Sequence, residues 1–122
     1  MLQGNFFTVA DIQMETGSIK AVLDINPAHE IFKGHFPGTP VVPGVCMMQM
    51  VKEIIENMVG GELRILRVDH MKFLTVINPE EKKLVQLEAK YSITEDKKIS
   101  VVASLMQDEV ACFKFKGLFN TH

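Results

Sequence analysis

The sequence contains no tryptophan, one tyrosine and only two cysteines, and this scarcity argues against several classes of protein. The separation of Cys46 and Cys112 in the sequence matches no metal-binding or redox motif. The sequence therefore indicates neither a fold stabilised by disulfides nor a cysteine-ligated zinc site. We expect both thiols to be reduced and buried. His29, His70 and His122 do not cluster with carboxylates at metal-ligand spacing, so the sequence predicts no metal site.

Long apolar runs and a strong charge excess are also missing. No run approaches the roughly 20 apolar residues of a membrane-spanning helix, and residues 1–7 lack the basic start and apolar block of a signal peptide. Thirteen lysines and arginines stand against fifteen aspartates and glutamates, with both signs interspersed and a net charge of −2. This balance argues against nucleic acid as a partner. We therefore expect a cytoplasmic protein without a membrane span.

The chain does have enough apolar material for one core. With 122 residues and a hydrophobic content of 47%, it is predicted to form a single domain over residues 1–122. Four of its eight methionines, Met47, Met48, Met50 and Met58, fall close together. Such flexible side chains fill the core in most proteins and line an apolar ligand channel in some, and the sequence leaves both open.

The periodicity of apolar residues predicts six strands and one long helix. The helix is expected over residues 44–58, where apolar residues recur at helical spacing, and the pair Gly60-Gly61 is a typical helix end. Residues alternate between apolar and polar in the strands, which are bounded by turn residues. The strands are expected at residues 5–14, 18–26, 63–76, 83–94, 98–107 and 110–119.

One helix against a curved antiparallel sheet of five to six strands is an α+β arrangement. A long central helix that follows the second strand makes the hot-dog fold the natural candidate.

The stretch before the helix is predicted to be a stiff loop. Three prolines and three glycines fall within residues 34–44, and each proline fixes its own φ and moves the preceding residue away from helical conformation. Pro43-Gly44 stands where the helix should begin, so backbone N–H groups are free there. A rigid loop that carries His35 and leads into a helix start is a plausible catalytic device.

The loop also carries a resemblance to a known family. Residues 34–45 read G-H-F-P-G-T-P-V-V-P-G-V. This stretch resembles the signature of the FabZ/FabA-type 3-hydroxyacyl-ACP dehydratases, G-H-F-P-G-x-P-x-x-P-G-V. Further along, Lys72-Phe73 followed by Val76-Ile-Asn-Pro79 is similar to a strand and turn of the same family, and the likeness extends weakly over the whole chain.

The resemblance implies a hot-dog fold and a dimer in which two sheets join edge to edge, with active sites at the interface. Such dimers can associate further, as a dimer of dimers or a trimer of dimers. It also implies a substrate tethered by phosphopantetheine to acyl carrier protein, in fatty-acid or related acyl-chain biosynthesis, and no other cofactor.

Three catalytic positions carry over from the resemblance. His35 occupies the place of the catalytic histidine, and an imidazole suits proton removal near neutral pH. Gly44 occupies the place of the glycine whose N–H binds the thioester carbonyl. Gln49 occupies the place of the catalytic Glu or Asp, which the other subunit supplies.

Four further residues are expected to contact the substrate: Phe36, Pro43, Val45 and Glu53. The helix departs from the family at this point, because the family reads Glu-x-x-x-Gln and this chain reads Gln49-x-x-x-Glu53. A glutamine can hold the substrate hydroxyl by hydrogen bonds, but it has no titratable proton. We expect Glu53 to be a solvated or interface charge rather than a displaced acid.

The missing carboxylate leaves several functions open. The chain is an enzyme, a hydro-lyase that uses the histidine alone or takes Glu53 or water as its acid, or it is an acyl-thioester-binding or partner subunit without catalysis. A hot-dog thioesterase is a third possibility, because this fold also supports that chemistry.

Overall fold

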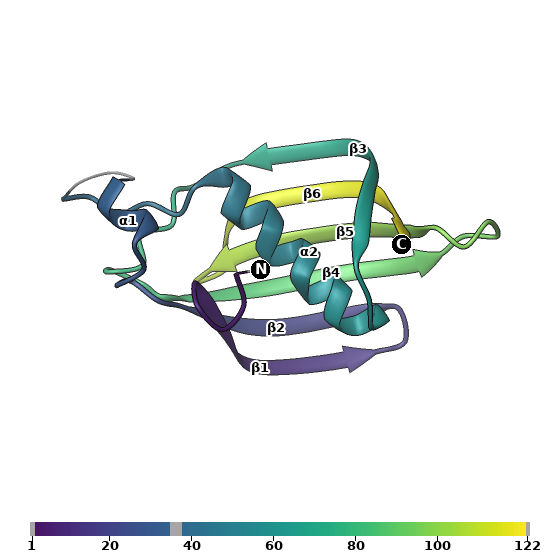
Figure 1. The fold of residues 1–122 in the computed structure, drawn as a ribbon, viewed down its shortest axis with the longest axis horizontal. Helices are drawn as coiled ribbons and strands as arrows, with labels where there is room; N and C mark the ends of the chain where they lie inside the picture. The colour runs from purple at the N-terminus through teal and green to yellow at the C-terminus, as the bar shows by residue number, and fades with distance from the viewer. Residues whose placement is uncertain (1, 35–37, 122) are drawn as a thin grey trace.

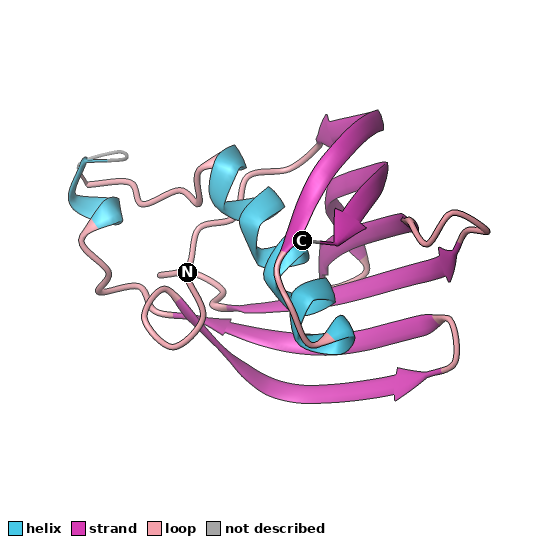
Figure 2. Ribbon diagram, turned by 45° about the vertical axis from the view of Figure 1, so that its right-hand side comes forward, coloured by secondary structure: helices cyan, strands magenta, loops and turns pink. Residues whose placement is uncertain are grey.

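The computed structural model describes residues 2–34 and 38–121. Six antiparallel strands form one sheet in the order β1-β2-β4-β5-β6-β3, and the long helix α2 lies across one face of it (Figure 1). The elements are β1 (Phe7–Glu15), β2 (Ser18–Ile25), α1 (Ile31–Gly34), α2 (Gly44–Val59), β3 (Leu63–Phe73), β4 (Leu84–Ile93), β5 (Ile99–Gln107) and β6 (Val110–Thr121). Figure 2 shows the sheet curving around the helix. The predicted α+β hot-dog architecture is confirmed.

The core forms because one face of the sheet is apolar along every central strand. The inward residues of β2, β4 and β5 alternate with exposed or half-buried ones, as the period of two requires. A fully buried valine, leucine or isoleucine side chain contributes about 1.5–3 kcal/mol relative to an exposed one. The buried residues of these three strands are Ile19, Ala21, Leu23, Ile25, Val85, Leu87, Ala89, Ile99, Val101, Ala103 and Leu105.

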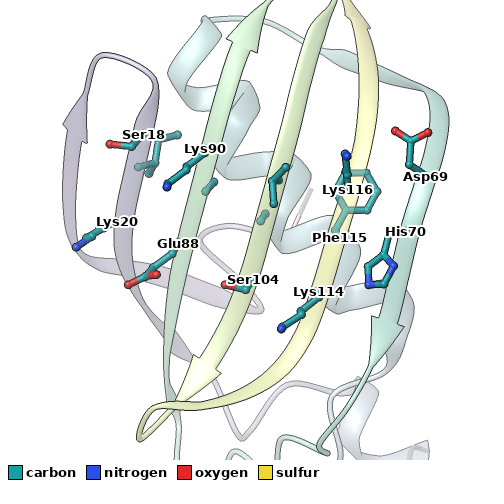
Figure 3. A pocket seen from close by; sticks show the side chains of 14 residues that line it. Ser18, Lys20, Asp69, His70, Glu88, Lys90, Ser104, Lys114, Phe115 and Lys116 are labelled. Carbon is teal, nitrogen blue, oxygen red and sulfur yellow. The ribbon is translucent and has the colours of Figure 1, made fainter.

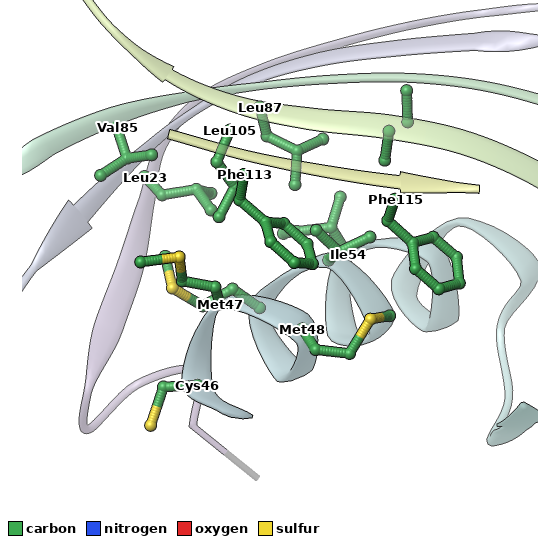
Figure 4. Close-up of a cluster of buried hydrophobic side chains, with 14 of the residues drawn as sticks. Leu23, Cys46, Met47, Met48, Ile54, Val85, Leu87, Leu105, Phe113 and Phe115 are labelled. Carbon is green, nitrogen blue, oxygen red and sulfur yellow. The ribbon is translucent and has the colours of Figure 1, made fainter. Parts of the chain in front are cut away.

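Helix α2 begins and ends where the sequence predicts. Pro43 is the N-cap residue, in an extended conformation, and Gly60 ends the helix in the left-handed region at φ 78°. The Gly60 N–H donates to the Glu56 carbonyl at 2.8 Å. Figure 4 shows the helix side chains Met47 and Ile54 facing Phe113 and its neighbours on the sheet.

Several element boundaries differ from the prediction by one to three residues, and one short helix was not predicted. Residues 31–34 form the single-turn helix α1, because the Phe32 and Lys33 N–H groups donate back to His29 and Glu30, although the sequence predicted an extended loop. Strand β1 begins at Phe7 rather than residue 5, since residues 2–6 form a turn in which the Phe6 N–H donates to the Leu2 carbonyl. Strand β3 ends at Phe73 rather than residue 76.

Strand β3 lies at one edge of the sheet and exposes an unusual amount of apolar surface. Its register against β6 shifts twice, between Ile65 and Arg67 and between Val68 and His70, so simple alternation fails along it. The exposed apolar residues on and just after this strand are Ile65, Leu66, Val68, Met71, Phe73, Leu74 and Val76. No helix in the described part of the chain is long and apolar enough to cross a membrane.

Candidate active site

The start of α2 packs directly against the end of β3. A Cβ atom added to Gly44 would lie 2.8 Å from Cε1 of Phe73, so any other residue here would displace that ring. Within the described residues no side-chain oxygen caps α2, because its N-cap is Pro43. The first N–H groups of a helix lack partners within the helix and carry partial positive charge. An acceptor oxygen placed beside Gly44 would therefore find donors.

The segment after β3 holds the loop in place. The Val42 N–H donates to the Ile77 carbonyl at 2.9 Å, and both side chains are buried. An apolar hollow of about 330 Å³ lies between the loop and this segment. It is lined by Val41, Val42, Gly44, Met47, Phe73, Leu74, Thr75 and Val76. The two stretches that carry the family resemblance thus meet at one place.

The methionines are divided between core and hollow. Met50 is fully buried in the core, and Met48 is buried beside Phe115 (Figure 4). Met47 is also buried, but it lines the hollow at the helix start. The sequence did not decide whether these methionines fill the core or line an apolar channel. Of the three, Met47 lines the apolar hollow.

His35 and Phe36 lie outside the described residues, so their predicted roles stay predictions. The residues just before them are in place. The Ile31 N–H donates to Nδ1 of His29 at 3.1 Å, and the His29 ring packs edge-on against Phe6 with centroids 5.4 Å apart. His29 therefore fixes the start of α1, and α1 leads into the histidine loop.

Gln49 and Glu53, one turn apart on α2, are joined by a hydrogen bond. Nε2 of Gln49 donates to Oε2 of Glu53 at 2.9 Å. The Leu2 N–H donates to the same oxygen at 2.7 Å, and the Gln3 N–H donates to Oε1 at 2.8 Å. Both carboxylate oxygens thus accept hydrogen bonds from N–H donors.

This arrangement corrects one prediction. Glu53 is only 2% exposed, so it is neither a solvated nor a surface charge. It is a buried anchor for residues 2 and 3 and for the Gln49 amide. Because a carboxylate accepts but cannot donate, the amide must turn its nitrogen toward Glu53 and its carbonyl oxygen to the other side. The expected substrate contacts of Glu53, Pro43 and the exposed Val45 stay predictions.

The two thiols are free and buried, as predicted. Burial raises the pKa of both Cys46 and Cys112 above the ordinary thiol value, so neither is an activated nucleophile. Among the described residues no three His, Cys, Asp or Glu side chains gather to hold a metal ion.

A hollow larger than the one at the helix start, about 650 Å³, lies elsewhere. It is on the outer face of the sheet, with α2 behind it (Figure 3). Lysines dominate its rim, including Lys20, Lys90, Lys114 and Lys116. Gly44, Gln49 and Glu53 do not line it, whereas Gly44 lines the small apolar hollow at the helix start.

Comparison with known proteins decides the family. The model of the ApeI-like family, described as ApeI dehydratase, matches residues 11–115. The chain belongs to the ApeI-like dehydratase family. The matched range includes the two segments of the candidate site, namely the loop before α2 and residues 72–79.

Relatives of this ApeI-like chain are named as FabZ dehydratases. It is 28% identical over 104 residues to 3-hydroxyacyl-[acyl-carrier-protein] dehydratase FabZ of Wolbachia pipientis wMel, covering 77% of this chain and 71% of the relative. The FabZ of Ralstonia nicotianae is 28% identical over 98 residues, covering 80% of this chain and 56% of that protein. The predicted FabZ/FabA-type family is confirmed.

Solved structures share the fold. The dehydratase heterocomplex ApeI:P from Xenorhabdus doucetiae superposes with a TM-score of 0.67 at 20% identity, covering 93% of this chain and 98% of that one. A structure described as a putative thioesterase from Ralstonia eutropha gives a TM-score of 0.61 at 16% identity, covering 93% of this chain and 83% of that one. Such low identities show the hot-dog fold alone.

Proposed function

We propose that this ApeI-like protein eliminates water from a 3-hydroxyacyl thioester and releases a 2-enoyl thioester. The observation that supports this most directly is the site at the start of α2. There Gly44, an apolar hollow and the loop that leads from His35 meet, and Gln49 lies farther along the same helix. We propose that the thioester is carried on phosphopantetheine of acyl carrier protein, in fatty-acid or related acyl-chain biosynthesis.

In this proposal His35 carries both proton transfers. The thioester carbonyl accepts a hydrogen bond from the Gly44 N–H, which makes the C2 proton more acidic. The imidazole of His35 removes that proton, the C2–C3 double bond forms, and the C3–O bond breaks. The same imidazolium returns the proton to the departing hydroxyl, so water leaves and the histidine is neutral again.

Gln49 takes the place of the acid without supplying a proton. Its carbonyl oxygen, turned away from Glu53, accepts a hydrogen bond from the substrate 3-hydroxyl and holds it for the reaction. Glu53 is a poor candidate for the acid, since its two oxygens bind the N–H groups of Leu2 and Gln3 in the interior. The role of Glu53 is then to orient the amide.

We also propose that two copies pair along β3. An edge strand presents unpaired N–H and C=O groups, and an apolar one is a template for another strand. Val68, Phe73 and Val76 are 45%, 54% and 68% exposed on this edge. Pairing there would cover them and would let one copy's Gln49 approach the other copy's histidine loop. A cytoplasmic location and the absence of any further cofactor stay predictions.

The test separates dehydration from thioester hydrolysis. Purified protein is incubated with a 3-hydroxyacyl thioester, and 2-enoyl thioester and free thiol are measured separately. Enoyl product that disappears in His35→Ala supports the proposal. Free thiol without enoyl product would instead identify a thioesterase. Since EDTA dialysis should leave the rate unchanged, a loss on dialysis would contradict the absence of a metal.

A second candidate is a non-catalytic subunit that binds acyl thioesters or completes an active partner. Two observations favour it: Gln49 has no titratable proton, and a structural neighbour is a dehydratase heterocomplex. In this case the protein alone binds the thioester and forms neither product. Activity then appears only when a homologue with the helix carboxylate is added.

A further inference from the structure

The outer face of the sheet concentrates positive charge that the dehydratase site does not use. Its hollow is rimmed by Lys20 on β2, Lys90 on β4, and Lys114 and Lys116 on β6. None of the ion pairs between described residues includes these four lysines. The lining carries these four lysines against two acidic residues, Asp69 and Glu88, so this face is positive although the chain as a whole has a net charge of −2.

The strand register gives this face the form of a groove along β5. On one side Lys90 lies opposite Val102 and Glu88 opposite Ser104. On the other side Lys116 lies opposite Val102, and Lys114 lies opposite Ser104. The short side chains of β5 form the floor, and the lysines of β4 and β6 form the two walls (Figure 3). The walls are two strand spacings apart, about 9–10 Å.

The acidic residues of the groove do not neutralise it. Arg67 already pairs with Asp69, and the hydrogen bond from Arg67 is the main cause that lowers the pKa of this aspartate. The positive charge of Lys116 lowers the same pKa further. Glu88 is then the one acidic side chain of the lining that faces four lysines.

We propose that this groove, with walls of Lys90, Lys114 and Lys116 and a floor of Val102 and Ser104, docks one acidic polypeptide segment of a partner protein. Its width suits one extended segment, whereas a helix with side chains, about 10–12 Å across, is wider than the groove. Carboxylates on both sides of such a segment would meet lysines on both walls. The half-exposed Val102 adds an apolar contact in the middle.

Other occupants fit less well. A second copy of this chain would bring the same positive face and be repelled. Pairing along the β3 edge extends the sheet sideways and leaves its outer face open. For nucleic acid we would expect arginines and stacking aromatic side chains, yet the described lining has neither arginine nor an outward aromatic ring, since Phe115 is buried in the core.

The experiment uses a short fluorescent poly-glutamate peptide and the full chain at low salt, with binding followed by anisotropy. We expect Lys116→Glu to weaken binding, and Lys90→Glu/Lys116→Glu to weaken it about tenfold or more, because each exposed charge pair contributes modestly and the contributions add. Added salt should weaken binding of the parent as well. The matched control Lys97→Glu makes the same charge change on the β4–β5 turn and should bind like the parent.

Each result decides the proposal. Loss in the groove variants with normal binding by Lys97→Glu supports it, provided that circular dichroism shows all variants folded. Equal loss in Lys97→Glu, or no binding by the parent, overturns it. So does tighter binding of a fluorescent DNA duplex or of phosphatidylglycerol vesicles than of the peptide. Dehydration activity on a free thioester is expected to be unchanged in the groove variants, so this test is independent of the proposed reaction.

Discussion

At the scale of single residues, the exchange of Gln49 and Glu53 is the feature that most affects the chemistry. A carboxyl at position 49 would lie where Nε2 now contacts Oε2 of Glu53 at 2.9 Å. Two carboxylates at that distance do not both ionise readily, so the new carboxyl would keep its proton to a higher pH than an isolated glutamate does. The native amide avoids this repulsion by donating to Glu53, but it cannot protonate a leaving hydroxyl.

We predict that Gln49→Glu raises the dehydration rate by about 10²-fold, the order that general acid catalysis supplies. The neighbouring carboxylate raises the pKa of the new carboxyl, so the gain should be present at lower pH and lost as pH rises through that pKa. The measurement is kcat against pH for parent and variant. An unchanged or lower rate at every pH would contradict a role for this position in proton donation.

The double variant Gln49→Glu/Glu53→Gln restores the order found in the family and serves as the matched comparison. It removes the like-charge pair but leaves a neutral amide to accept from the Leu2 and Gln3 N–H groups. Hydrogen bonds to a charged group are worth more than those to a neutral one, so we expect a loss of roughly 1–2 kcal/mol in unfolding free energy. Urea denaturation of the parent, the double variant and Glu53→Gln measures this loss. If all three proteins were equally stable, Glu53 would not be an anchor.

The thiols give a second prediction at this scale. Burial raises the pKa of Cys46 and Cys112, so at neutral pH the reactive thiolate is scarce in the folded protein. Iodoacetamide should modify both slowly at pH 7 and faster as pH rises toward and above the ordinary thiol pKa. Modification should become fast in denaturant. Mass spectrometry at timed intervals checks this, and rapid labelling of the folded protein at pH 7 would refute it.

At the scale of elements, two glycines mark where backbones or rings approach closely. A Cβ on Gly117 of β6 would lie 2.5 Å from the Arg67 carbonyl oxygen, which belongs to the backbone of β3. A Cβ on Gly44 would meet the Phe73 ring at 2.8 Å, and a side chain can move aside more easily than a strand. The two substitutions should therefore differ in their main effect.

We predict that Gly117→Ala lowers the unfolding free energy by about 1–3 kcal/mol, as overpacking does. Gly44→Ala should cost less stability but most of the activity, because it displaces Phe73 and narrows the hollow at the helix start. Adding Phe73→Leu to Gly44→Ala should restore part of the activity by making room. Urea denaturation and the enoyl-product assay are the measurements, and full activity in Gly44→Ala would show that the helix start does not bind substrate.

At the scale of the whole molecule, the proposed pairing of two copies along the exposed β3 edge can be tested directly. Lysine on an edge strand blocks strand pairing, so Val68→Lys should convert a dimer to a monomer. It should also abolish activity, because the proposed site is built from residues of both copies. Ile12→Lys on the opposite edge strand, β1, is the matched control and should stay dimeric and active. Analytical ultracentrifugation beside the product assay decides it. If the parent protein is a monomer, the homodimer proposal is wrong and the partner-subunit alternative is favoured.

The sequence by itself determined the elements, because their causes are local. Alternation of period two defines the strands, Pro43 and Gly60 bound α2, and the proline-rich loop before α2 carries the family resemblance. Bulges in β3 and the single turn of α1 were missed, since they depend on register against β6 and on a cap by His29 rather than on periodicity.

Only the tertiary structure decided what surrounds Glu53 and which strands are edges. Two of the three donors to Glu53 are backbone N–H groups about fifty residues away in the chain, and a backbone donor leaves no mark in the sequence. The order β1-β2-β4-β5-β6-β3 likewise places β3 beyond β6 although it precedes β4 in the chain, which exposes its apolar residues. The groove of lysines arises in the same way, because register across β4, β5 and β6 brings Lys90 and Lys116 to opposite sides of Val102. Contacts between residues distant in sequence are set by packing of the whole sheet, and local patterns cannot encode them.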